Sequence, residues 1–125
     1  MALPLITSTP LPGPTLTKAV ARATAALGIN QGELGTILGL SKASISRLIA
    51  GTIQLEPRRR KEWEMAILFV RLFRSLDAVV GHGEPAHRWL RGPNLAIGRP
   101  PIEEITSAEG LVRVVQYLDA IRGRV

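Results

Sequence analysis

Residues 31–49 read QGELGTILGLSKASISRLI, and this stretch decides how the first half of the chain folds. Asn30 stands just before it, and Glu33 follows Asn30 by three residues, a spacing that predicts a capping box. A short helix over 31–38 is therefore expected. Gly39 ends that helix, because glycine tolerates the positive φ that a sharp turn needs.

A second short helix is expected over 42–50, directly after the turn. Ser41 supplies its N-cap and Gly51 ends it. Two such helices across a tight turn form a helix-turn-helix. Since Ile45 and Leu48 share an inward face, helical geometry turns the opposite face to the surface. The side chains on or beside that outer face are Lys42, Ala43, Ser46 and Arg47.

The rest of the chain indicates further helices joined by short connections, with no alternating strand pattern. A second capping box, formed by Thr106 and Glu109, is expected to open the last helix. The fold class is therefore all-α, with a helix-turn-helix bundle followed by a small helical domain. The remaining helices are expected over 15–27, 57–80, 85–91, 101–105 and 107–122.

Composition excludes several function classes. The chain has 125 residues, a formal charge of +6 and no cysteine, which removes disulfides, thiolate metal sites and cysteine nucleophiles. His82 and His87 are poorly spaced for a metal ion, and no set of nucleophile, base and orienting group is present. We expect no enzyme activity, no metal and no cofactor. No apolar stretch approaches the roughly 20 residues of a membrane helix, and no secretory signal opens the chain, so a cytoplasmic protein without a membrane partner is expected.

The positive charge is concentrated in the first half. Residues 1–14 carry no charge and four prolines, so we interpret them as a flexible arm. Residues 15–62 hold eight Lys/Arg against three Asp/Glu, whereas residues 63–125 hold eight against seven. This asymmetry predicts two functional units, the first of which meets nucleic acid.

Residues 65–70 are apolar on every face of the expected helix. A helix that is apolar all round must be covered all round, by the core of its own chain or by a second subunit. We choose this stretch as the contact of a homodimer. The residues proposed for that contact are Met65, Ile67, Leu68 and Phe69.

The stretch 31–49 closely resembles the helix-turn-helix of the Xre/Cro/phage-repressor family, with Gly35 in place of the usual alanine. The resemblance implies that the second helix enters the major groove, where Arg47 contacts guanine, and that Gln31 contacts phosphate. A helical hairpin that touches no DNA is the alternative. The implied DNA contacts are Gln31, Lys42, Ala43, Ser46 and Arg47, to which the basic run adds Arg58, Arg59 and Arg60, either as phosphate contacts or as a solvated face.

The second half reads HRWLRGPNLAIGRPPIEEITSAEGLVRVVQYLDAIRG over 87–123 and resembles the Xre/MbcA/ParS toxin-binding domain. The family's usual Leu-Gly-Gly is replaced here by Ala96-Ile97-Gly98. The resemblance implies an antitoxin whose C-terminal region covers the NAD pocket of a RES-domain toxin. The residues proposed to contact the toxin are Trp89, Arg91, Pro93, Asn94, Arg99, Tyr117, Arg122 and Arg124.

Some of these residues also suit structural roles. Trp89 and Tyr117 fit a core position as well as an interface, and the terminal arginines complement the negative end of the last helix. The sequence thus predicts an antitoxin that binds operator DNA and a RES-type toxin, as a homodimer within a larger hetero-oligomer. One alternative is a phage-like dimeric repressor with no toxin partner. Another is a toxin-binding module whose helix-turn-helix no longer binds DNA.

Overall fold

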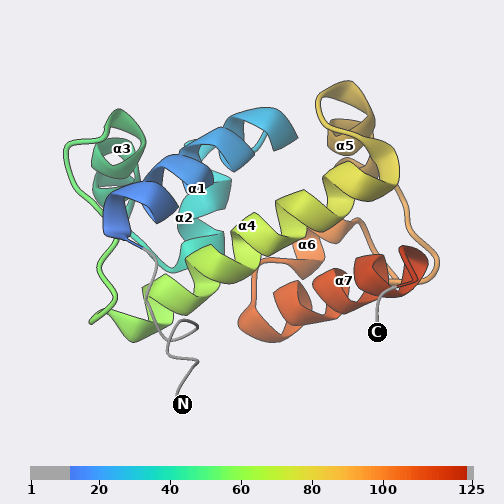
Figure 1. The fold of residues 1–125 in the computed structure, drawn as a ribbon. Helices are drawn as coiled ribbons and strands as arrows, with labels where there is room; N and C mark the ends of the chain where they lie inside the picture. Colours follow the sequence, from blue (N-terminus) through green and yellow to red (C-terminus); the bar gives the residue numbers. More distant parts are fainter. Residues whose placement is uncertain (1–11, 124–125) are drawn as a thin grey trace, which may run out of the picture.

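The computed structural model describes residues 12–123, and within that range the secondary structure is helical, without a strand. This confirms the all-α fold. No helix in the described range is both long and apolar enough to cross a membrane. The elements, shown in Figure 1, are α1 (Gly13–Leu27), α2 (Gln31–Leu38), α3 (Lys42–Ala50), α4 (Arg60–Val80), α5 (Glu84–Arg91), α6 (Pro101–Glu104) and α7 (Ala108–Ile121).

The caps of α2 and α3 are formed as the sequence predicts. The Glu33 amide donates to Asn30 Oδ1 over 2.8 Å, and the Asn30 amide donates to Glu33 Oε1 over 3.0 Å. The Ser44 amide donates to Ser41 Oγ over 3.1 Å. Both helices therefore start and stop where local signals place them.

Helices α1 and α4 begin two or more residues away from the positions expected, whereas α5 and α7 differ by one residue. Helix α1 starts at Gly13, so Gly13 and Pro14, assigned from sequence to the arm, are its first turn. Helix α4 starts at Arg60 rather than Pro57. The Arg59 amide closes a separate turn onto the Glu56 carbonyl over 3.0 Å, which delays the start of α4.

The N-cap of α7 is Ser107, not Thr106 as predicted. Ser107 Oγ accepts a hydrogen bond of 3.0 Å from the Gly110 amide. The Thr106 hydroxyl instead donates to the Glu103 carbonyl over 2.8 Å and satisfies the end of α6. Adjacent Thr and Ser residues both suit a cap, and the preceding turn decides between them.

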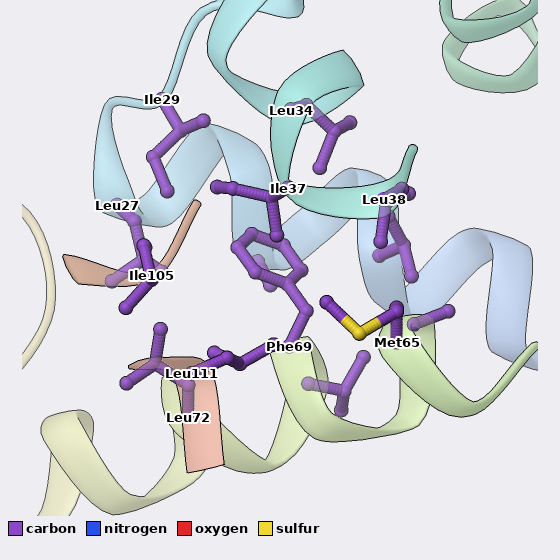
Figure 2. Packing of buried hydrophobic residues seen from close by; sticks show 14 of the residues in the cluster. Leu27, Ile29, Leu34, Ile37, Leu38, Met65, Phe69, Leu72, Ile105 and Leu111 are labelled. Atoms are coloured by element: carbon purple, nitrogen blue, oxygen red, sulfur yellow. The ribbon is translucent and has the colours of Figure 1, made fainter. Parts of the chain in front are cut away.

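Helix α4 lies along the middle of the molecule, with α1–α3 on one side and α6 and α7 on the other, and α5 lies over the C-terminal end of α4, near α1 (Figure 1). It packs against α1 and α2 and also against α5 and α7. Phe69, which is fully buried, points from α4 towards Ile37 of α2, and Leu72 and Leu111 lie just beneath it (Figure 2). The two halves of the chain therefore share one hydrophobic core.

Two of the four residues proposed for the dimer contact are buried in this shared core. Met65 and Phe69 are 6% and 0% exposed because α1, α2 and α7 of the same chain cover them. Neither side chain can meet a second subunit while the core stays closed. Ile67 is 41% exposed and Leu68 is half-buried, so only these two remain available for a contact between chains.

Candidate functional site

The turn between α2 and α3 is built by close backbone contact. Gly39 has a φ of 74° and its amide donates to the Gly35 carbonyl over 2.8 Å. Gly35 is buried, and a Cβ there would lie 2.9 Å from the Leu40 carbonyl oxygen. The glycine that replaces the usual alanine thus lets the turn close tightly over α2.

Helix α3 presents its predicted outer face to solvent. Ile45 and Leu48 are buried and anchor the opposite face. Within residues 12–123, no ion pair involves Arg47, so its guanidinium can donate to an external acceptor. An exposed helix with one uncommitted arginine suits insertion into the major groove. The exposed residues of this face are Lys42, Ala43, Ser46 and Arg47.

Gln31 and Lys42 lie together although they belong to different helices. Both line a shallow hollow of about 340 Å³ across the helix-turn-helix. Gln31 is the first residue of α2, where backbone amides lack partners within the helix. A lysine, an amide side chain and unpaired backbone amides together suit a phosphate group.

The basic run before α4 is exposed but partly paired. Arg58 Nε lies 2.6 Å from Glu56 Oε1, and Arg59 lies 3.5 Å from Glu62. Arg60 begins α4 and has no ion pair in the described part of the chain. The run therefore offers less unpaired positive charge than its sequence indicates.

Lys18 is a basic residue for which the sequence predicts no role. It is exposed on α1 and lines a hollow of about 310 Å³ with Ile49 and Gln54, beside the end of α3. The helical spacing of the apolar residues in α1 predicts that Lys18 lies on the exposed face of this helix. Its closeness to α3 was not predictable, because that contact is tertiary.

Trp89 of α5 and Tyr117 of α7 stack on each other. Their ring centroids are 6.5 Å apart and their planes differ by 20°. Both rings are half-buried against the core. The structure thus places them in packing, with one edge of each left at the surface.

The connection between α5 and α6 is an ordered loop. Asn94 Oδ1 accepts from the Ile97 amide over 3.0 Å, and Arg99 Nε donates to Glu104 over 2.8 Å. Glu104 is buried and also accepts from Arg113. Asn94 and Arg99 therefore shape the loop. Leu95, which the sequence analysis missed, is fully exposed at its tip.

Arg122 is engaged within the chain. It donates to Ser75 Oγ over 3.0 Å and lies 3.8 Å from Asp119. Hydrogen bonds from Ser75 and then Arg71 lower the pKa of Asp119. These side chains line a hollow of about 620 Å³ between α4 and α7. Pro93 is exposed, whereas Arg124 lies outside the described residues.

Arg91 does not stand as an isolated surface residue either. Its guanidinium donates to both carboxylate oxygens of Glu33 on α2, over 2.8 and 2.9 Å. Of the candidate toxin contacts, Arg91, Arg99 and Arg122 are therefore bound to acidic or polar partners within the chain. Sequence spacing gave no sign of the pairing between Arg91 and Glu33, which lie 58 residues apart.

A capped helix-turn-helix with an exposed second helix, sharing its core with further helices, defines a DNA-binding protein with an appended helical domain. Residues 8–71 match the Antitoxin Xre-like helix-turn-helix domain, and residues 75–124 match the Antitoxin Xre/MbcA/ParS C-terminal toxin-binding domain. The chain belongs to the Xre/MbcA/ParS antitoxin family. No curated protein matches it.

The family assignment settles the class of function. The protein is an antitoxin with a DNA-binding half and a toxin-binding half, and it acts by binding rather than by catalysis. A toxin partner favours this reading over a phage-like repressor without one. The two matches meet within α4, the helix whose side chains serve both parts of the core.

Proposed function

We propose that this antitoxin binds a RES-domain toxin that consumes NAD and covers its active site, and that it represses its own operon by binding operator DNA. The observation that carries the proposal is the joining of an Xre-like helix-turn-helix to the toxin-binding domain on one chain. The exposed face of α3 supports DNA binding, and the half-buried aromatic stack and the ordered loop support partner binding.

In the proposed DNA complex, α3 enters the major groove and Arg47 donates to guanine O6 and N7. Gln31 and Lys42 contact a phosphate, because they line one hollow. Two chains read half-sites about 34 Å apart as a homodimer. The dimer forms part of a larger complex with the toxin, in the cytoplasm where operator DNA lies.

Replacing Arg47 with alanine is expected to cost about 1–3 kcal/mol of operator binding and to relax the sequence preference. The measurement is fluorescence anisotropy with double-stranded DNA from upstream of the antitoxin's own gene, compared with shuffled DNA. Arg74→Ala removes another exposed arginine, from α4 and outside the helix-turn-helix, and serves as the control. Unchanged affinity and preference in Arg47→Ala would mean that α3 does not read the operator.

The proposed toxin surface includes the loop between α5 and α6. Leu95 is fully exposed on a loop that Asn94 and Arg99 hold in shape, which is the setting of an apolar interface anchor. Leu95→Asp is expected to weaken capture of a RES-domain toxin by about 1–3 kcal/mol. The free energy of unfolding of the Leu95→Asp antitoxin should change little, because the side chain at position 95 contacts solvent.

The control for that variant is Ile53→Asp, which places the same charge on another exposed apolar residue, in a loop outside the toxin-binding match. Both variants are compared by calorimetric titration with a catalytically inactive RES-domain toxin. Equal binding by Leu95→Asp and the unchanged antitoxin would remove this loop from the interface. Failure of the unchanged antitoxin to bind would instead contradict the RES-type partner.

A further inference from the structure

An ion pair joins the toxin-binding region to the helix-turn-helix. Arg91, the last residue of α5, donates to both oxygens of Glu33, which is the third residue of α2. The guanidinium makes a third hydrogen bond from Nη2, the nitrogen that donates to Glu33 Oε1, to the Gly28 carbonyl over 2.9 Å. Bidentate geometry of this kind fixes orientation as well as distance. The N-terminus of α2 is therefore held from outside its own motif.

Two further contacts keep α5 on the connection between α1 and α2. The Gly83 amide donates to the Ala26 carbonyl over 3.2 Å. The His87 ring packs so closely that a Cβ on Gly28 would lie 2.8 Å from its Cδ2. The guanidinium thus approaches Glu33 from a supported helix, and both side chains are about two-thirds buried.

Glu33 carries a charge that DNA binding has to accommodate. The hydrogen bonds from Arg91 lower the pKa of this carboxyl, so it is ionised at neutral pH. Glu33 lies two residues after Gln31, in the first turn of α2, and we place a DNA phosphate at this N-terminal end of the helix. Like charges within the Debye length of about 8–10 Å repel each other. An unpaired Glu33 would therefore oppose the phosphate contact.

We propose that Arg91 is a positioning residue for DNA recognition, which acts through Glu33 by cancelling its negative charge beside the site of the phosphate. The inference rests on the proposed docking of α2 against phosphate. It moves Arg91 from the toxin surface, where the sequence placed it, to the DNA-binding function. One arginine of the toxin-binding region thereby serves the other half of the protein.

Three variants test the proposal, namely Arg91→Gln, Glu33→Gln and the double variant. Glutamine at position 33 keeps the capping box but removes the charge. Arg91→Gln is expected to weaken operator binding about tenfold, the size of effect that one unpaired like charge produces near a phosphate. Glu33→Gln alone should bind at least as well as the unchanged protein. The double variant should recover most of the lost affinity.

The rescue separates this role from a direct phosphate contact. If Arg91 touched DNA itself, the double variant would stay as weak as Arg91→Gln, and the slope of affinity against salt would fall by about one ion. That result would overturn the proposal. Equal affinity of Arg91→Gln and the unchanged protein would overturn it as well.

Two controls accompany the three variants. Arg88→Gln removes an exposed arginine from the same helix and should leave operator affinity unchanged. Thermal unfolding of each variant checks that the fold persists, as expected for an ion pair near the surface. If the unchanged protein itself fails to bind the operator fragment, the proposed DNA function fails, and that outcome differs from a missing rescue.

Discussion

Phe69→Ala is expected to lower the free energy of unfolding by about 3–5 kcal/mol. Phe69 is fully buried on α4, between Ile37 of α2 and Leu111 of α7 (Figure 2). Removing its ring leaves a cavity that rigid neighbours on two sides cannot fill. Since small domains are stable by only about 5–15 kcal/mol, this loss is a large share of the total.

The matched control is Ile67→Ala, two residues earlier on the same helix but 41% exposed. It should cost less than about 1 kcal/mol in the monomer. Urea unfolding followed by circular dichroism measures both variants, and analytical ultracentrifugation follows their oligomeric state. A shift towards monomer in Ile67→Ala would support the remaining dimer contact. A small effect of Phe69→Ala would contradict the shared core.

The helix-turn-helix was predictable from sequence because its signals are local. Asn30 and Glu33 cap each other over three residues, and Gly39 and Gly51 end their helices with positive φ. Such signals act within one helical turn and survive in any tertiary setting. The boundaries of α2 and α3, and the outward face of α3, therefore agree with the sequence.

The candidate toxin surface was less predictable because its residues depend on distant partners. The roles of Arg91 and Arg122 follow from Glu33 and Ser75, 58 and 47 positions away. The apolar stretch of α4 posed the same difficulty. Periodicity shows that a side chain needs cover, but it does not show whether the cover is the same chain or a second one.

The start of α7 shows how a packing contact decides a local choice. Gly110 is the third residue of α7 and is fully buried against α6, where a Cβ would collide with the Glu104 carbonyl oxygen. Ser107 caps the helix by accepting from the Gly110 amide. This close approach holds Glu104 where Arg99 and Arg113 reach its carboxylate.

Gly110→Ala is therefore expected to destabilise the protein by about 2 kcal/mol or more, although alanine is the better helix former by about 0.5–1 kcal/mol. The added methyl group meets backbone, which cannot rotate away, so α6 and α7 must separate. The measurement is the change in the free energy of unfolding by urea, together with the loss of toxin capture at 37 °C.

Gly32→Ala is the control, because Gly32 is exposed in the first turn of α2 and a Cβ there would lie 3.3 Å from the Asn30 side chain and would meet no backbone atom of another element. That variant should shift stability by less than about 1 kcal/mol in either direction. The sign of the change in the free energy of unfolding caused by Gly110→Ala shows whether helix propensity or the packing of α6 on α7 dominates. Stabilisation would show that helix propensity dominates and that α6 does not pack against α7 as described. Destabilisation beyond the control would show that the turn between them, and with it the buried Glu104, depends on a residue without a side chain.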